Sequence, residues 1–166
     1  MDEALVAALV EVEHHVAQLG WDQPARLFAL VRTVDLIAAE PHLAEHLSAA
    51  SPDGFSSVEQ EQFHAGDDLG SALARIAWPP TVAGCVLALE RAFLPPSAEA
   101  DLPEDETAAA RAVATHPDRM DLRVVVGVTR DGSSHGIARV RAEDGELLSG
   151  SDLVPALAAA LAHTLE

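Results

Sequence analysis

The start of the chain carries an apolar stripe with the period of an α-helix. The stripe is made of residues at alternating steps of four and three: Leu5, Leu9, Val12, Val16 and Leu19. Polar residues such as Glu11 and His15 fall on the opposite side. Asp2 can cap the helix at its start, and Gly20 is a natural stop at its end. The pattern predicts a helix between them that packs on the protein's own sheet.

Apolar runs of strand length follow at residues 26–31 and 82–94. Both runs are apolar on two sides, which is typical of strands with two buried faces. The segment 58–63 stays ambiguous. Ser57 with Gln60 fits a helical capping box, whereas the alternation from Val58 onward fits an edge strand.

A β-hairpin is predicted around Asp131-Gly132, a dipeptide typical of a two-residue turn with positive φ at both positions. Residues 122–129 and 135–142 flank this turn and form its two strands. The predicted cross-strand pairs are Val128 with His135, Val126 with Ile137, and Val124 with Arg139.

Helices are predicted in four further segments. They cover residues 33–39, a stretch from Asp67 or Asp68 to Trp78, residues 107–115, and a last helix capped by Ser151 or Asp152 with Leu153, Leu157 and Leu161 on one side. Together the patterns predict an α+β fold in a single domain over residues 1–166. We expect a sheet of four or five mainly antiparallel strands, with the N- and C-terminal helices packed on one face. The acidic, Pro-rich segment 95–106 is predicted to be a mobile loop.

The charge of the chain limits its partners. Its 27 acidic residues stand against ten basic residues, all of them Arg, which gives a net charge of −17. Affinity for nucleic acid and for anionic membranes depends on basic side chains, so neither partner is expected. A basic or apolar partner, a metal ion, or solubility alone remain as explanations. The hydrophobic fraction of 49% and a last helix that is apolar on more than one side favour a weak two-fold homodimer.

The use of cysteine and the start of the chain point to one compartment. Cys85 is the only cysteine and has apolar neighbours, so we expect a buried, inert thiol and no intrachain disulfide. Asp2 and Glu3 follow Met1 where a secretory signal would be basic. The longest apolar run, residues 154–162, is too short to span a bilayer. A cytoplasmic protein is therefore expected.

Two short motifs match enzyme patterns. His42, Glu45 and His46 fit H-x-x-E-H, in which two His bind zinc and the Glu polarises a water. Pro41 leaves this segment only a short helix, and no third ligand is marked by its context. Residues 132–136 fit G-x-S-x-G, but that motif needs a strand-to-helix turn and here lies in the predicted hairpin. We therefore expect no catalytic residues and no cofactor.

Trp21 and Trp78 are the candidate binding residues. Each is followed within three residues by proline, and each ends a predicted element near the edge of the sheet. One interpretation is an aromatic plug over the core; the other is an aromatic contact in a binding groove, where Trp is enriched.

Four blocks of the sequence carry a resemblance: residues 20–24 with 26–31, residues 74–79 with Ala83-Gly84-Cys85, residues 116–119 with 125–128 and 130–132, and residues 151–155. Together they resemble an uncharacterised actinobacterial protein family over nearly the whole chain. The resemblance implies a bacterial cytoplasmic origin and carries no activity, ligand or site residue onto this chain. The leading hypothesis is thus a non-catalytic domain that binds a protein or peptide. The alternative is a metal-dependent hydrolase that uses His42, Glu45 and His46.

Overall fold

The fold alternates helices with the strands of one sheet. The computed structural model of the chain describes residues 3–39, 41, 54–64, 69–93, 103–115, 120–141, 147–150 and 155–166. The elements, in order, are α1 (Glu3–Gln18), β1 (Arg26–Arg32), α2 (Thr33–Ala39), β2 (Phe55–Glu59), α4 (Leu69–Ala74), β3 (Gly84–Phe93), α6 (Glu106–Thr115), β4 (Met120–Thr129), β5 (Ser134–Val140), β6 (Leu147–Gly150) and α7 (Pro155–Thr164).

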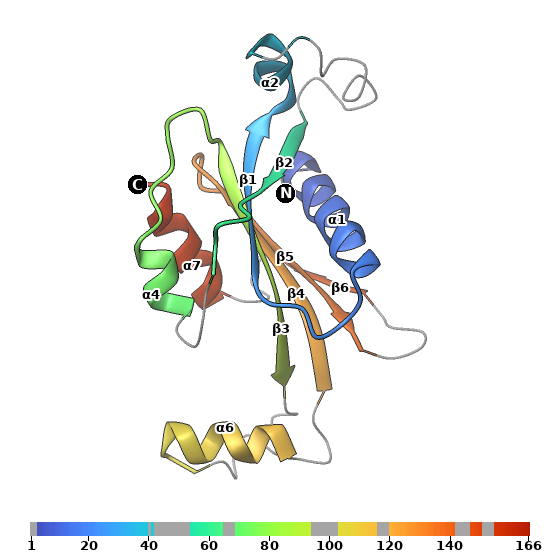
Figure 1. Ribbon diagram of the computed structural model, residues 1–166, viewed down its shortest axis with the longest axis vertical. Helices are drawn as coiled ribbons and strands as arrows, with labels where there is room; N and C mark the ends of the chain where they lie inside the picture. The colour runs from blue at the N-terminus through green and yellow to red at the C-terminus, as the bar shows by residue number, and fades with distance from the viewer. Residues whose placement is uncertain are drawn as a thin grey trace.

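All six strands form one antiparallel sheet in the order β2-β1-β3-β4-β5-β6 (Figure 1). The predicted α+β class and antiparallel sheet are confirmed. The described residues form six strands, where four or five were expected. The additional strand is β6, whose four residues have too little pattern to be recognised and which forms by pairing with β5, as in Ile137 opposite Ser149. The ambiguous segment near residue 58 contributes an edge strand, β2, that ends at Glu59.

The two terminal helices cover opposite faces of the sheet, so the prediction that they share one face is wrong. The physical reason lies in the strands, where successive side chains point to opposite faces and both sets are buried. In β1, Leu27 packs in the cluster under α7, while Phe28 packs in the cluster under α1. A sheet that is apolar on both faces needs a cover on each.

On the first face, α1 packs across β2, β3, β4 and β5. Its predicted stripe is buried from Leu5 to Val16, whereas Leu19 lies beyond the end of the helix and is 42% exposed. Gly20 ends the helix with a φ of 86°, as its sequence position predicts. Gly127 of β4 lies directly beneath: a Cβ there would stand 2.7 Å from a methyl group of Leu9. The missing side chain thus lets α1 approach the sheet closely.

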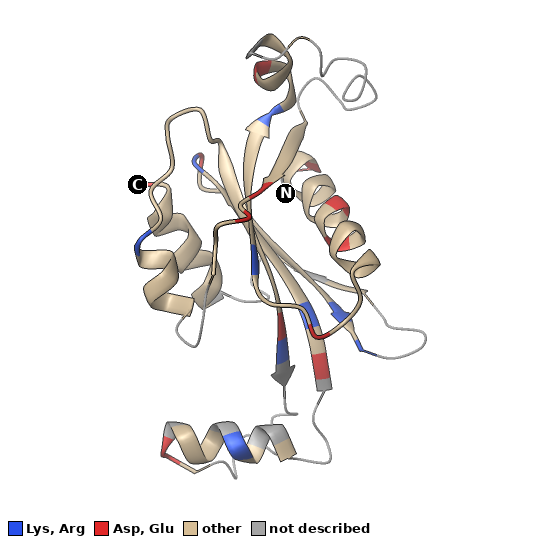
Figure 2. Cartoon of the chain, in the orientation of Figure 1, with Lys and Arg blue, Asp and Glu red and all other residues tan. Residues whose placement is uncertain are grey.

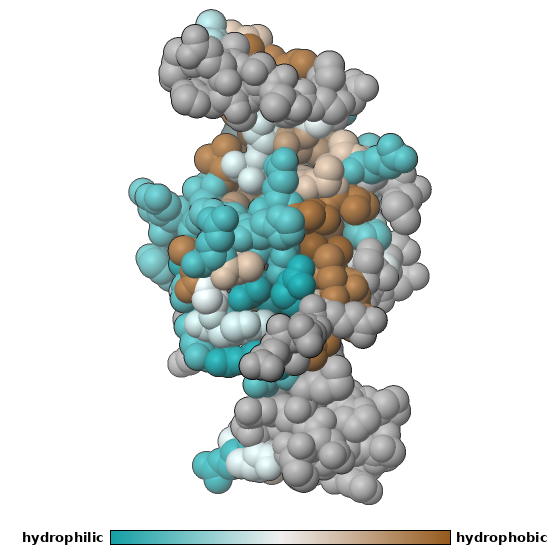
Figure 3. Space-filling model, turned by 90° about the vertical axis from the view of Figure 1, so that its right-hand side faces the viewer, coloured by the Kyte–Doolittle hydropathy of each residue, from teal (hydrophilic) through white to brown (hydrophobic). Residues whose placement is uncertain are grey.

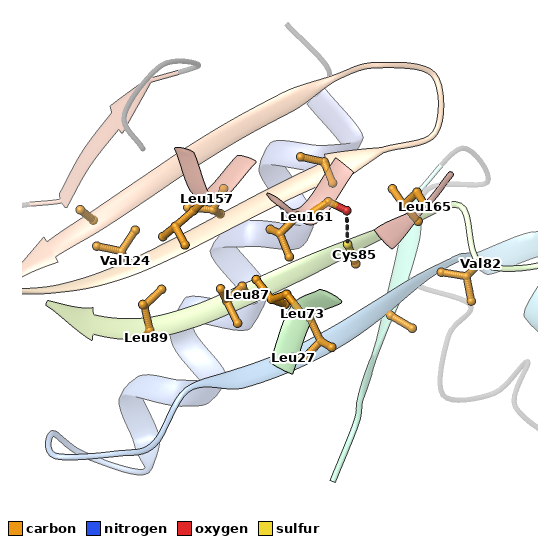
Figure 4. Packing of buried hydrophobic residues seen from close by; sticks show 14 of the residues in the cluster. Leu27, Leu73, Val82, Cys85, Leu87, Leu89, Val124, Leu157, Leu161 and Leu165 are labelled. Atoms are coloured by element: carbon orange, nitrogen blue, oxygen red, sulfur yellow. Dashed lines mark hydrogen bonds between the residues drawn. The ribbon is translucent and has the colours of Figure 1, made fainter. Parts of the chain in front are cut away.

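On the second face, α7 and α4 pack against each other and over the middle of the sheet. Figure 4 shows two leucines of α7, Leu157 and Leu161, and Leu165 just after its end, all packed in the core under the helix. The predicted stripe of the last helix is therefore confirmed from Leu157 onward, while Leu153 lies outside the described residues. Arg130 joins the C-terminal end of α7 to the sheet by donating to the carbonyls of Leu165 and Val82.

The predicted hairpin forms at the expected place, but its turn and register differ from the prediction. The N–H of Gly132 donates to the carbonyl of Thr129, and within the turn only Gly132 has positive φ, at 94°. This is a turn followed by one left-handed residue, a longer loop than the predicted two-residue turn. The added residue shifts the register by one, so that Val128 lies opposite Ser134. A one-residue shift moves every side chain of the partner strand to the other face.

The remaining helices are close to their predicted positions. Helix α2 matches, and α6 begins after Asp105, whose carboxylate accepts from the N–H of Ala108 at 2.9 Å. The helix expected to reach Trp78 is shorter, ending as α4 at Ala74 before the Pro79-Pro80 turn. Most of the predicted loop 95–106 lies outside the described residues. No helix in the described ranges is long and apolar enough to cross a membrane.

Replacing Gly132 with Ala is expected to destabilise the protein by about 1–2 kcal/mol, because Ala is strained at positive φ. Gly150→Ala is a matched control. Neither glycine has an atom within 4 Å of the added Cβ, and Gly150 does not have positive φ. Denaturant titration measures both free energies of unfolding. Equal changes in the free energy of unfolding for the two substitutions would show that the positive φ of Gly132 does not explain the loss of stability.

Candidate functional site

A cleft of about 610 Å³ lies where β1 begins. One wall is the loop that follows α1, and the other is the chain that leaves β2 and leads to α4. In Figure 2, acidic and basic residues lie close together at the start of β1 and towards the end of β3, the two strand ends that border the cleft. The lining residues are Gln23, Pro24, Ala25, Arg26, Glu59, Gln60, Glu61, Phe63, His64, Leu69, Leu89, Glu90 and Arg91.

The apolar part of the cleft belongs to the core under α7. Phe63 and Leu69 are partly buried against that core, and Leu89 of β3 is 9% exposed. These side chains give the cleft an apolar floor that is continuous with the packed interior. A rigid apolar floor with few polar groups around it is the usual form of a binding site.

The first polar group is an ion pair between adjacent strands. Arg26 of β1 donates to Glu59 of β2 at 2.6 Å and to the side-chain carbonyl of Gln23 at 3.1 Å. The imidazole of His15, on α1, lies 3.5 Å from the other oxygen of Glu59. Both partners of the Arg26–Glu59 pair are about one quarter exposed, so the pair is reachable from the cleft.

The second polar group is Glu90 of β3, which holds the loop after α1. Its two carboxylate oxygens accept from the backbone N–H groups of Asp22 and Gln23 at 2.9 Å and 2.8 Å. Asp22 has a φ of 65°, the one positive φ at a non-glycine residue in the described part of the chain. A residue held in this region costs free energy, and such residues gather at sites that bind ligands. Arg141 pairs with the Asp22 carboxylate and lowers its pKa.

A buried charge network lies under the same loop. Glu13 of α1 is 1% exposed and accepts from Arg123 of β4 at 3.3 Å and from Arg139 of β5. Arg123, itself 2% exposed, also donates to the carbonyl of Gly20 at 3.2 Å. The hydrogen bond to Glu13 raises the pKa of the Arg139 guanidinium. Charges this far from water require partners, so the network fixes α1 and the start of the loop on the sheet.

The two candidate tryptophans lie on opposite faces of the sheet and do not share a groove. Trp21 is on the α1 face, with the guanidinium carbons of Arg123 and Arg141 4.3 Å and 5.3 Å from its ring centre. Trp78 packs against the core under α7, and its indole N–H donates to the Thr164 hydroxyl at 2.9 Å. Trp78 thus closes the core beside α7. Trp21 belongs to the loop that walls the cleft.

Of the two enzyme motifs, only the one at residues 132–136 lies within the described residues. His42, Glu45 and His46 lie outside the described residues. Within the described ranges, no group of three or more His, Cys, Asp or Glu side chains could hold a metal ion. Residues 132–136 join two strands, as expected, so Ser134 does not stand on a strand-to-helix turn. Burial lowers the pKa of His135 in the same segment.

Cys85 is a buried thiol, as the sequence predicts. It is fully buried in β3, with its sulfur 3.8 Å from the carbonyl of Leu161 (Figure 4). Burial raises the pKa of the Cys85 thiol to about 11, against smaller opposing effects of Thr164, Trp78 and Arg130. A thiol with this pKa is a poor nucleophile at neutral pH.

Most polar residues of the site were missed by the sequence interpretation. Glu13 falls four residues after Leu9 and three before Val16, at the border of the apolar stripe. This spacing could have indicated that its carboxylate is buried. Arg123 likewise interrupts an apolar strand. The pairs Arg26–Glu59 and Glu90–Asp22 join residues 33 and 68 positions apart, and no local pattern relates them.

The fold and the cleft define a small α+β domain whose single antiparallel sheet is covered on both faces. The chain belongs to the PPA1309-like protein family, whose model matches residues 5–166. The family is uncharacterised and is named after a Propionibacterium protein, which confirms the resemblance found in the sequence. No curated protein and no solved structure matches the chain.

The stability of the protein is expected to fall between about pH 9 and 11 through Cys85. The raised pKa means that the unfolded chain loses its thiol proton at lower pH than the folded protein, so rising pH favours unfolding. The pKa of the thiol rises from 9.0 to about 11 on folding, and this difference corresponds to about 2–3 kcal/mol in the free energy of unfolding. The chain has no Lys and no Tyr, so no other side chain has its ordinary pKa in this window. Denaturant titrations across this pH range should show that the free energy of unfolding falls with rising pH, and Cys85→Ala should remove this fall. The same fall in the variant would show that a group other than Cys85 causes it.

Replacing Glu13 with Ala is expected to destabilise the protein by about 3–5 kcal/mol, because Arg123 would remain buried without its carboxylate. Glu11→Ala, on the exposed side of α1, is the control and should change stability by less than about 0.5 kcal/mol. The double variant Glu13→Leu with Arg123→Met should recover much of the loss, since it removes the two fully buried charges and leaves only Arg139, whose side chain is 30% exposed. Chemical denaturation measures all three. Equal losses for the Glu13 and Glu11 variants would contradict the role of the network.

Proposed function

We propose that this protein is a non-catalytic binding domain that holds a short segment of a protein partner in the cleft at the start of β1. The observation that carries the proposal is the cleft itself. It combines a volume of about 610 Å³, an apolar floor of Phe63, Leu69 and Leu89, and a charged rim. That volume is within the range of sites that enclose several ligand side chains or a small molecule.

The strands around the cleft suit an extended peptide. β1 begins at Arg26, opposite Ala88, whereas β3 continues to Phe93. β3 therefore runs on for five residues past its last pairing with β1. An extended segment laid along this part of β3 would continue the line of β1, which is how many domains add a partner strand to a sheet.

The carboxylates of the cleft are held in fixed positions, which suits binding. Glu59 is oriented by Arg26, and Glu90 by two backbone N–H groups of the loop. A wall that is ordered before the partner arrives loses little conformational entropy on binding. The alternative, a hydrolase using His42, Glu45 and His46, is distinguished by metal analysis of freshly purified protein. Stoichiometric zinc that His42→Ala abolishes would favour that alternative.

Selection of peptides from a random display library on the purified protein tests the proposal. We expect bound peptides to change the backbone NMR signals of residues 23–26, 59–64 and 89–91. Glu61→Arg, in the exposed rim of the cleft, should weaken the selected peptides by about tenfold, which corresponds to 1.4 kcal/mol. Glu11→Arg on the outer side of α1 is the matched control, because it makes the same change of charge away from the cleft. Peptides that bind elsewhere, or no enrichment from the library, would contradict the proposal.

We further propose that the domain acts in the bacterial cytoplasm and associates weakly with a second copy of itself. Figure 3 shows hydrophobic side chains gathered in a band on the α1 side of the molecule. Both edge strands also carry an exposed apolar residue, Val58 in β2 and Leu147 in β6. Two protomers of charge −17 repel each other over about 10 Å at 0.1 M salt, and added salt shortens that range.

Self-association is therefore expected to strengthen as salt rises, the reverse of a contact built on ion pairs. Sedimentation velocity at low and high salt, at tens of micromolar protein, measures the effect. Leu147→Glu and Val58→Glu should distinguish the two edges, since only a substitution in the contact weakens the dimer. A monomer under both salt conditions would show that the apolar surfaces are satisfied within one chain.

A further inference from the structure

We infer that the cleft selects an arginine or lysine side chain of the partner segment, with the aliphatic stem on the apolar floor and the cationic head between Glu61 and Glu90. The inference rests on the proposed function and names the chemistry of its ligand. Arg and Lys side chains bury their methylene stems along apolar surface and keep the charged head among polar groups. The cleft offers both surfaces where β3 runs past β1: Leu89 faces the core under α7, and Glu90 lies on the other face of the same strand end.

The charges of the cleft favour a cation. Its lining holds three carboxylates, Glu59, Glu61 and Glu90, against two arginines, Arg26 and Arg91. Arg26 is already paired with Glu59 at 2.6 Å, which leaves Glu61 and Glu90 against Arg91 at the exposed rim. Outside the lining, Arg141 also attracts Glu90 electrostatically, but its own ion pair is with Asp22. The field of the whole chain, at −17, adds to the local excess and raises the concentration of cationic ligands near the surface.

Glu90 is placed to receive a cationic head without being moved. Its two oxygens accept from uncharged backbone N–H groups of Asp22 and Gln23. A carboxylate has about four acceptor positions, so each oxygen retains capacity for a further donor. Because the donors are neutral, they orient the carboxylate without cancelling its charge. An incoming guanidinium or ammonium group therefore meets a fixed anion.

The protein's own Arg26 illustrates how this cleft holds a guanidinium. One terminal nitrogen of Arg26 donates to the Glu59 carboxylate and the other to the Gln23 amide oxygen. Both acceptors belong to the cleft lining. The same walls thus already bind one guanidinium by a carboxylate on one side and the loop after α1 on the other. Phe63, which also lines the cleft, is an aromatic residue of the kind that attracts cations at its ring face.

Peptide mixtures with one fixed central residue test the inference. The probes are Ac-X-X-Arg-X-X-NH2, with X any uncharged residue, and the same mixtures with Lys, citrulline or Glu at the centre. Citrulline keeps the shape of Arg and removes its charge. NMR titration of the full chain should give changes at residues 59–64 and 89–91 with Arg and Lys. Citrulline should bind at least about fivefold more weakly, the factor that corresponds to roughly 1 kcal/mol.

Substitutions in the protein should give the matching result. Glu61→Gln removes an exposed rim charge, and Glu90→Gln keeps one acceptor for the loop. Each should reduce the preference for Arg over citrulline by about fivefold. Glu11→Gln on the outer side of α1 should leave that preference unchanged. If Glu90→Gln disturbs the loop, Glu61→Gln alone still tests whether a carboxylate charge of the cleft causes the preference for Arg over citrulline.

The outcomes separate this inference from the proposed function. Equal binding of the Arg and citrulline mixtures at the cleft would overturn the cation preference and leave peptide binding in place. Binding of the Glu mixture in preference to Arg would overturn it as well. If none of the mixtures changes the cleft signals, the inference is overturned, and the random library then decides on its own whether the cleft binds peptides.

Discussion

The buried carboxylate of Glu13 is the interaction on which the arrangement of the α1 face depends. It lies between α1 and the sheet, almost without access to water, and accepts from arginines of two adjacent strands. A charge in this position is stable only with its partners in place. The network adds directional contacts to the apolar packing of the α1 stripe, in which Leu9 lies over Gly127. The direction in which the chain leaves α1 is fixed as a result.

The loop after α1 connects this network to the cleft. Arg123 binds the carbonyl of Gly20 and stacks on Trp21, and Glu90 binds the next two backbone N–H groups. These contacts compensate for the unfavourable φ of Asp22. The loop then forms one wall of the cleft, opposite the chain that leaves β2. In this view the charge network contributes to binding by holding a wall in place, although Glu13 itself does not line the cleft.

The sequence predicts local features of this protein better than features that join distant segments. The α1 stripe, the apolar runs of β1 and β3 and the hairpin all have a period that the residues themselves display. The register of the hairpin depends on one residue of loop length, and β6 depends on pairing with β5, so both need the tertiary structure. The cleft joins residues near positions 25, 60 and 90, which no sequence pattern groups. Its residues were therefore missed, and of the two tryptophans only Trp21 lies in the loop beside it.

The most direct test of the account is the hydrogen exchange of the Asp22 and Gln23 amides, which donate to Glu90. The comparison is between the wild-type protein and the double variant Glu13→Leu with Arg123→Met, in which the buried charges are absent. If the network holds the cleft wall, exchange of these two amides should accelerate at least about tenfold in the variant. The amides of Val86 and Val125 in the central strands should remain protected. Unchanged protection of Asp22 and Gln23 in a folded variant would contradict the account.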